Sequence, residues 1–238
     1  MTTTQGEFAI HRSDDRGTTD LGWLHARHSF SFGRYHDPER NSFRSLRVLN
    51  DDIIDPGGGF GRHPHENMEI ISWMLGGALE HTDSSGQRGV IKPGDVQVMT
   101  AGRGIEHSEM NASQTEAANL IQIWIEPAER NLDPTYSQKS FPIKGRRNQW
   151  QNVVGPDGGD GALRINQDAI LSVAELAEGR RLDVAVSVRR YGYLHIAFGT
   201  VRIDKQTLHA GDSITWTGPD GFVVEGLKES QLLFFDLS

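Results

Sequence analysis

Residues 57–76 read GGGFGRHPHENMEIISWMLG, and residues 102–111 read GRGIEHSEMN. Each stretch carries two potential metal ligands at alternate positions: His63 and His65 in the first, His107 and Glu109 in the second. Because successive side chains of a β-strand point to opposite faces, the two ligands of each pair face the same way. On neighbouring strands of a β-barrel, three imidazoles and one carboxylate would converge on one point. These stretches therefore predict a metal site within a β-barrel.

The predicted ligands are compatible with several metals and do not identify one of them. Three neutral imidazoles and a carboxylate suit Fe, Cu, Ni, Mn or Zn, and the spacing does not choose among them. A His-x-His pair alone is a weak signal, because short motifs match often by chance and such pairs are commonly unrelated surface or core histidines. The glycine framework around the pair is more specific. It reads G-x5-H-x-H-x3-E-x6-G from Gly57 to Gly76, and G-x-G-x2-H-x3-N from Gly102 to Asn111.

This framework matches the first cupin motif at every position and the second in part. The chain resembles the pirins, a branch of the bicupins, and especially the bacterial pirin-like proteins assigned as quercetin 2,3-dioxygenases. Further runs share the resemblance: HSFSFGRYHDP at 28–38, LRVLNDDII at 46–54, MTAGRGIEHSE at 99–109 and LIQIWI at 120–125. The likeness is dense from about residue 20 to 142 and looser elsewhere.

The resemblance implies an all-β bicupin fold, with two tandem cupin barrels of the double-stranded β-helix or jelly-roll type. It also implies one divalent metal per chain, with the ligands His63, His65, His107 and Glu109. Many cupins take their carboxylate ligand from the position of Glu69. Pirins use the Glu two residues beyond the last His, so we expect Glu109 to bind the metal and Glu69 to lie near it or to line the barrel. Glu109 is also the expected catalytic base.

An internal repeat predicts two similar domains. The run IKPGDVQVMTAG at 91–102 aligns with LHAGDSITWTGP at 208–219. We expect residues 1–142 to form an N-terminal cupin with the metal site, and residues 143–238 a degenerate C-terminal cupin. In the second repeat, the ligand positions fall near Ala185, Ser187 and Val224. That domain would keep the scaffold without the ligands.

Several segments have clear secondary-structure signals. Leu46–Ile54, Met68–Leu75 and Leu120–Ile125 are apolar runs typical of buried strands. Their frequent turn signals indicate a sandwich or barrel. The run SVAELAE at 172–178 predicts instead a short helical turn, because Ser172 and Glu175 form a capping-box pattern.

Composition limits the class of protein. The net charge of −8 argues against general nucleic-acid binding, which needs a basic face. The absence of Cys excludes disulfides and thiol catalysis and fits a reducing compartment. We find no signal peptide and no apolar run long enough to cross a membrane. We therefore expect a cytoplasmic protein. We also expect a monomer, since a bicupin already pairs two barrels within one chain.

Other histidines and apolar residues are weaker candidates. His28 and His36 would be structural or lie outside the ligand shell, and His81 could border the site because it follows the Gly76-Gly77 turn. The rest are expected in the core or on the surface: His11, His25, His195 and His209. Four large side chains are expected in the barrel core, where some could line a substrate cavity: Met68, Trp73, Met99 and Trp124.

The resemblance supports two functions of different classes. One is a dioxygenase, with iron as Fe(II) expected and Zn, Ni, Cu or Mn open, that cleaves the flavonol ring of quercetin with O2 and releases carbon monoxide. The alternative is a non-catalytic, metal-binding pirin-like regulator that binds protein partners. A third reading is another reaction on a small molecule that carries a phenol or an enediol.

Overall fold

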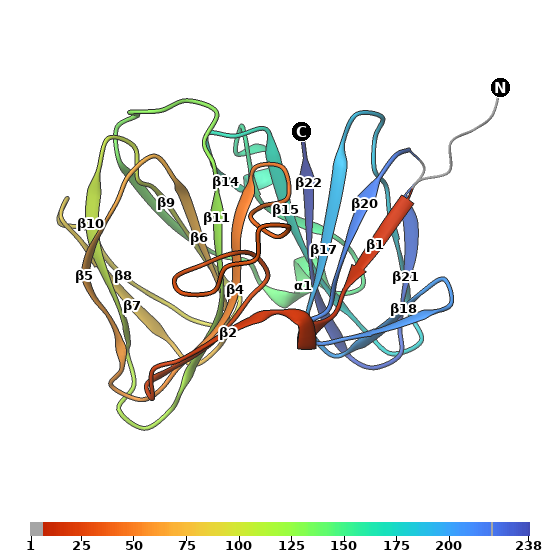
Figure 1. Cartoon of the computed structure of the whole chain (residues 1–238), viewed down its shortest axis with the longest axis horizontal. Helices are drawn as coiled ribbons and strands as arrows, with labels where there is room; N and C mark the ends of the chain where they lie inside the picture. Colours follow the sequence, from red (N-terminus) through yellow and green to blue (C-terminus); the bar gives the residue numbers. More distant parts are fainter. Residues whose placement is uncertain (1–6, 220) are drawn as a thin grey trace. The chain divides into compact units, whose positions relative to one another are not determined.

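The computed structural model describes residues 7–219 and 221–238, and these are almost entirely β-strands (Figure 1). The chain divides into two compact units. The N-terminal unit comprises Gly17–Phe141 and Leu163–Gln167. The C-terminal unit comprises the segment that ends at Arg16, Pro142–Ala162 and Asp168–Ser238. The predicted domain boundary between residues 142 and 143 stays a prediction.

The N-terminal unit contains two antiparallel sheets that face each other across its interior (Figure 1). The larger sheet has the order β12-β9-β6-β11-β4-β3-β2. Its strands are β2 (Gly17–Asp20), β3 (Leu24–His28), β4 (Leu46–Ile54), β6 (Glu69–Gly76), β9 (Asp95–Thr100), β11 (Ala118–Ile125) and β12 (Thr135–Ser140). The smaller sheet has the order β5-β10-β7-β8. Its strands are β5 (Gly59–His65), β7 (Leu79–Asp83), β8 (Arg88–Ile91) and β10 (Ile105–Asn111).

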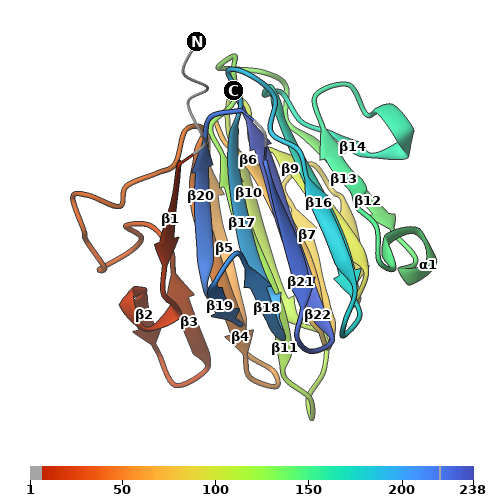
Figure 2. The ribbon, with the colours of Figure 1, turned by 90° about the vertical axis from the view of Figure 1, so that its right-hand side faces the viewer.

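The C-terminal unit repeats this plan. Its larger sheet runs β1-β20-β17-β22-β15-β13, with β20, β17 and β22 side by side in Figure 2. These strands are β1 (Glu7–His11), β13 (Gln151–Gly155), β15 (Ala169–Leu176), β17 (Tyr191–Phe198), β20 (Ser213–Thr217) and β22 (Ser230–Leu237). Its smaller sheet runs β16-β21-β18-β19. These strands are β16 (Arg181–Val184), β18 (Thr200–Ile203), β19 (Gln206–His209) and β21 (Phe222–Gly226).

Short elements complete the described chain. They are the helix α1 (Ile143–Arg146), the two-residue strand β14 (Leu163–Arg164) and 3-10 turns at Ser13–Asp15 and Gly159–Gly161. None of the helices in the described part of the chain has the length and apolarity needed to cross a membrane.

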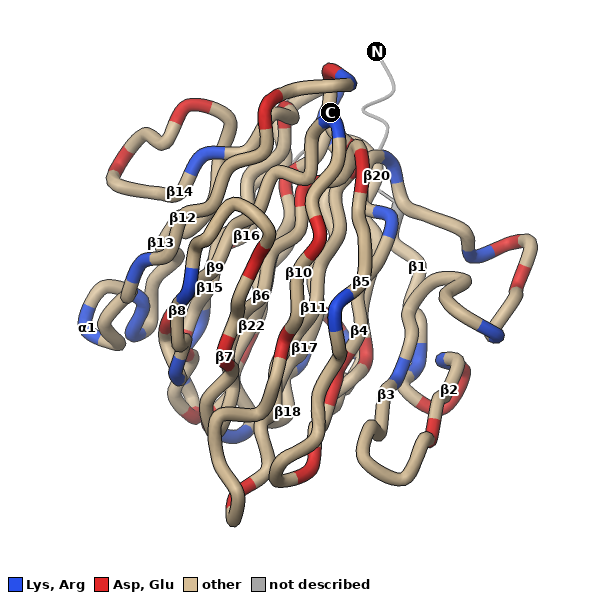
Figure 3. Tube along the Cα trace, turned by 90° about the vertical axis from the view of Figure 1, so that its left-hand side faces the viewer, with Lys and Arg blue, Asp and Glu red and all other residues tan. Residues whose placement is uncertain are grey.

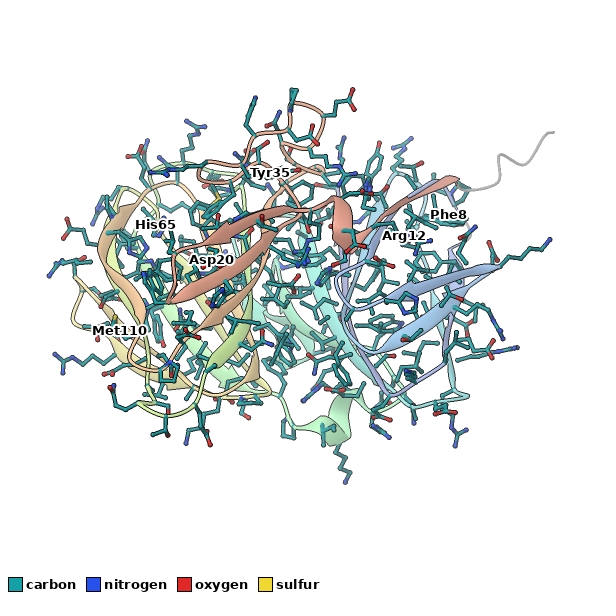
Figure 4. All side chains as sticks on the ribbon, turned by 60° about the horizontal axis from the view of Figure 1, so that its bottom comes forward. Phe8, Arg12, Asp20, Tyr35, His65 and Met110 are labelled. Carbon is teal, nitrogen blue, oxygen red and sulfur yellow. The ribbon has the colours of Figure 1, made fainter. Side chains whose placement is uncertain are left out.

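The first described strand belongs to the C-terminal unit. β1, which carries Phe8 (Figure 4), pairs along its whole length with β20. The ring of Phe8 stacks on that of Trp216. Beyond β1, Arg12 Nη1 donates to the buried carboxylate of Asp212 (2.9 Å), and the backbone N–H of Ser13 donates to the same group (2.8 Å). These contacts join segments that are 200 residues apart in sequence.

The two interiors differ in polarity. Buried apolar side chains fill the C-terminal unit, including Val184, Val201 and Val224. In the N-terminal unit, a row of buried polar side chains crosses the larger sheet in register. The row consists of Gln97 on β9, Ser72 on β6, Gln122 on β11, Asn50 on β4 and His28 on β3. Buried polar groups are costly without partners, so this row gives the N-terminal unit an interior in which polar side chains must bind one another.

One secondary-structure prediction is wrong. Residues 172–176 lie in the strand β15, which pairs with β13 and β22, and not in a helical turn. Ser172 Oγ donates to Asn152 Oδ1 (2.7 Å) on the neighbouring strand instead of capping a helix. Burial between two strands outweighs the local capping pattern.

Candidate metal centre

Strand β10 carries two of the predicted ligands and lies between β5, which carries the other two, and β7. Its side chains alternate, with His107 and Glu109 buried and Met110 exposed on the other face (Figure 4). In the ladder with β5, His107 is paired with His63. In the ladder with β7, Glu109 is paired with His81. Along this sheet, acidic and basic residues are interspersed (Figure 3), with an ion pair between Arg62 and Glu106 (2.7 Å).

Three imidazoles form the outer part of the cluster. His63, His65 and His107 each offer a nitrogen, and these atoms lie within 4.8 Å of one another. The Nε2 atoms of His63 and His107 are 3.0 Å apart. His63 Nδ1 is 2.7 Å from the carbonyl oxygen of Gly61, so it donates there and leaves Nε2 to face the cluster. A cation between these rings would meet lone pairs from two strands.

Burial and neighbouring imidazoles disfavour the protonated forms of His65 and His107. Burial, and then the neighbouring His65, His63 and His81, lower the pKa of His107 to about 2. Burial and the neighbouring His63 lower the pKa of His65 to about 4. Near neutral pH, both rings are unprotonated, which is the form that binds a metal ion.

A second group lies behind His107. His81, His107 and Glu109 offer ligand atoms that also lie within 4.8 Å of one another, and all three side chains are buried. His81 Nε2 is 3.2 Å from Asp83 Oδ2, and the ring of Tyr136 stacks on the ring of His81 at 4.7 Å. His107 thus belongs to both groups and connects them.

The carboxylate of Glu109 is held by the polar row of the opposite sheet. Gln122 Nε2 donates to Oε2 (2.9 Å), and Ser72 Oγ and Gln97 Nε2 lie 3.4 Å and 3.5 Å from Oε1. Burial nevertheless raises the pKa of Glu109 to about 7, because these hydrogen bonds offset only part of the desolvation. The four predicted ligands therefore fall into two groups that share His107, with His63 and His65 in one and Glu109, beside His81, in the other. Imidazole nitrogens and a carboxylate are donors that fit a divalent cation.

The remaining candidates lie outside these groups. Glu69 is buried and accepts hydrogen bonds from Thr100 Oγ1 (2.8 Å) and Asn166 Nδ2 (3.0 Å). His28 is buried and contacts Thr19 Oγ1 (2.8 Å) and Asn50 Oδ1 (2.9 Å). Glu69 and His28 therefore form hydrogen bonds within the barrel wall and have none to the imidazole cluster among these contacts.

Two cavities flank His65. One, of about 520 Å³, is lined by His65 with Pro64, Glu66, Ser84 and Ile105. The other, of about 600 Å³, lies beyond Trp124, whose ring meets His65 edge to face at 4.9 Å. Its wall includes Phe32, Tyr35, His36, Val48 and Met68. Both volumes are in the range of small-molecule sites.

Sequence reasoning missed several polar neighbours of the cluster: Ser72, Asp83, Gln97, Gln122 and Tyr136. They lie on strands whose pairing is set by the folded barrel. One signal was available, because Asp83 follows His81 by two positions and so shares its face of β7.

Comparison with known proteins gives matches over nearly the whole chain. The sequence profile of the family described as Pirin matches residues 10–125, and that of the Quercetinase C-terminal cupin domain matches residues 152–237. A quercetin 2,3-dioxygenase of Escherichia coli K12 is 37% identical over 229 residues, covering 96% of this chain and 97% of the relative. A pirin-like protein of Caulobacter vibrioides is 38% identical over 224 residues, covering 94% and 96%.

A solved structure agrees with the sequence matches. The E. coli bacterial pirin YhhW in complex with nickel(II) has a TM-score of 0.91 and 36% identity, and the match covers 97% of this chain and 99% of that one. The predicted all-β bicupin fold is thereby confirmed. The relative's nickel and the His/Glu cluster described above agree in pointing to a divalent metal, whose identity they leave open.

Proposed function

This chain belongs to the pirin family, and on that premise we propose that it is a dioxygenase that opens the flavonol ring of quercetin-like substrates with O2 and releases carbon monoxide. A relative named quercetin 2,3-dioxygenase supports this substrate class, since the likeness extends over both barrels. The observation that carries the proposal is the buried carboxylate of Glu109, which lies in one potential ligand group with His107, while His107 lies in a second with His63 and His65.

We assign His63, His65, His107 and Glu109 as the ligands of one metal ion, with Fe(II) as the ion. When bound, the ion supplies Lewis-acid chemistry that stabilises a substrate oxyanion. The residues contribute neutral nitrogen donors and one anionic oxygen. Gln122 and Ser72 orient that oxygen through their hydrogen bonds to Glu109.

Glu109 is the proton acceptor in this proposal. In the metal-free protein, burial raises the pKa of Glu109 to about 7, so its surroundings favour the protonated carboxyl group. A general base works best when its pKa lies near the working pH. Glu109 would therefore accept the proton of the flavonol 3-hydroxyl and hold it at a carboxylate oxygen.

The cavity beyond Trp124 suits the flat rings of the substrate. Trp124 and Phe32 meet edge to face at 5.4 Å, and Met68 and Val48 extend the apolar wall. This wall places aromatic surface next to His65, while the loop from Ser31 to His36 lines the far side. Ring contacts of this kind bind and orient a planar ligand.

The direct test is carbon monoxide release from quercetin. The protein is reconstituted anaerobically with Fe(II), and in parallel with Ni(II), and is then exposed to O2. We expect catalytic carbon monoxide from the wild type and none from the double variant His63→Ala/His107→Ala. No product from a protein shown to hold one ion would favour the non-catalytic regulator instead.

A second prediction concerns Glu109 alone. In the Glu109→Gln variant, we expect turnover to fall by roughly 10²-fold or more, the scale of a lost general base, while metal affinity falls less. The measurements are kcat at saturating quercetin and metal affinity by chelator competition. Equal turnover in metal-replete wild type and variant would rule out the role of Glu109 as base.

A further inference from the structure

We infer that His81, held by Asp83, is a positioning residue that fixes the ring of His107 in the tautomer presenting Nε2 to the metal. The inference rests on the metal site proposed above, but not on its substrate or reaction. It follows from where the hydrogens must lie along a chain of buried groups, from Asp83 on β7 to His107 on β10.

The first link fixes the tautomer of His81. An ionised carboxylate only accepts hydrogen bonds, so His81 Nε2, at 3.2 Å from Asp83 Oδ2, carries the hydrogen. The other oxygen of Asp83 accepts from Ser85 N (2.9 Å), Ser85 Oγ (2.7 Å) and Gln87 N (3.1 Å), so the carboxylate cannot turn away. In neutral His81, Nδ1 is therefore an acceptor.

The second link passes this constraint to His107. The Nδ1 atoms of His81 and His107 are 3.4 Å apart, and both rings are buried. Because His81 Nδ1 accepts, His107 Nδ1 carries the hydrogen, and the lone pair of His107 lies on Nε2. That atom is 3.0 Å from Nε2 of His63, whose own hydrogen is directed to Gly61. Two lone pairs facing each other at this distance are satisfied by a cation.

Packing against Tyr136 holds the ring of His81 in place between Asp83 and His107. The ring of Tyr136 stacks on His81 with an interplanar angle of 23°, and His81 is fully buried. Metal-binding histidines commonly donate their second nitrogen to a carboxylate or carbonyl, which sets the tautomer and orients the ring. Here a histidine takes the place of that acceptor, with a carboxylate one step behind it.

An alternative is a second metal ion bound by His81, by Glu109 and by His107 through its Nδ1 atom. The contacts of Gln97 favour the hydrogen-bonded arrangement. Its Nε2 lies 3.5 Å from His81 Nδ1, so an amide donor already faces the nitrogen of His81 that would bind the second ion.

Zn(II) binding and nitrogen-detected NMR test the inference without any turnover. His81→Phe keeps an aromatic ring against Tyr136 but removes both nitrogens, whereas His81→Asn keeps an acceptor near the position of Nδ1. We expect Zn(II) affinity to fall 10- to 100-fold in His81→Phe and to recover to within a few-fold of wild type in His81→Asn. Tyr136→Phe is the matched control and should bind as wild type does.

The NMR arm uses the zinc-loaded wild type, so it does not depend on the variants folding. We expect a hydrogen on Nδ1 of His107 and on Nε2 of His81, and one zinc per chain. An Nδ1 of His107 without hydrogen would overturn the inference. So would two zinc ions per chain, one of them lost in His81→Phe, because that result identifies a second metal position. Equal affinity in wild type and His81→Phe would also overturn it, whether or not quercetin is cleaved.

Discussion

Glu109 is a carboxylate placed where the fold disfavours its charge. Its pKa is about 7 in the folded protein, against an ordinary value of 4.5, and burial is the main cause. Between these values the folded state binds more protons than the unfolded state. Without metal, the contribution of this group to stability therefore falls as pH rises from 4.5 to 7. The group that we propose as the base therefore lowers the stability of the metal-free protein near neutral pH.

We predict that Glu109→Gln stabilises the metal-free protein at pH 8 by roughly 3 kcal/mol, since the variant carries no charge to bury. At pH 5 the advantage should fall to about 1 kcal/mol, because Glu109 is then mostly protonated when folded and the unfolded group is only partly protonated. The measurement is urea unfolding at both pH values with a chelator present. His65 and His107 titrate in both proteins, so they cancel in the comparison. An equal advantage at both pH values would show that the cause is not the charge.

At this scale the sequence predicted part of the cluster. Alternation along each strand put His63 with His65, and His107 with Glu109, and the structure brings the three histidines together. The sequence could not show that His81 belongs to the cluster, because its position beside Glu109 depends on the pairing of β7 with β10. That pairing is a long-range contact which no local pattern encodes.

At the scale of the elements, Gly59 sets how closely β5 approaches β10. A Cβ atom at this position would lie 2.5 Å from the carbonyl oxygen of Glu109 and 2.6 Å from Met110 Cα. Its φ of 156° is also one that other residues rarely adopt. A side chain here would push apart the two strands that carry His63 and His107.

Gly59→Ala should therefore weaken metal binding at least several-fold and destabilise the fold by about 1–3 kcal/mol, as overpacking does. Chelator competition and urea unfolding measure the two effects. Gly61→Ala is a control on the same strand, since a Cβ there would meet nothing within 4 Å. If the two variants behave alike, close strand approach is not what the glycine provides.

Strands with strong apolar patterns were predictable, and β4 spans the same residues, Leu46–Ile54, as the run that predicted it. The failure at 172–178 has a physical cause. Its capping pattern is local, whereas the segment lies in the middle of a sheet, and Glu175 there contacts Arg146. Local propensity is overridden where both neighbours in the sheet are distant in sequence.

At the scale of the whole molecule, the two units share a strand plan but not an interior. The internal repeat revealed the similarity, and the positions aligned with the ligands pointed to a degenerate second cupin. Val224, aligned with His107, is buried on β21 among apolar side chains. The sequence could not show that β1 belongs to the C-terminal unit, because strand pairing over that separation leaves no local trace.

Asp212 accepts hydrogen bonds from Arg12 and Ser13, which directly follow β1. We therefore expect removal of the Asp212 carboxylate to lower the free energy of unfolding. Asp212→Ala removes the acceptor of the backbone N–H groups of Ser13 and His209, and leaves Arg12 Nη1 only the carbonyl oxygen of Thr207. We expect a loss of about 2 kcal/mol in the free energy of unfolding, the scale of hydrogen bonds to a charged group. Urea unfolding followed by fluorescence measures it. The exposed Glu178→Ala should change stability by under about 0.5 kcal/mol, and an equal loss there would contradict this account.

The pairing of β1 with β20 has a consequence for how the protein is made. A ribosome releases β1 among the first segments, but its partner, Ser213–Thr217, comes only near the end of synthesis. The N-terminal unit has all its strands once Gln167 has emerged, and since domains generally fold as units during synthesis, we expect it to fold first. Until β20 emerges, β1 lacks the strand with which it pairs. Nascent chains are therefore most exposed to mispairing with one another during the last stretch of translation.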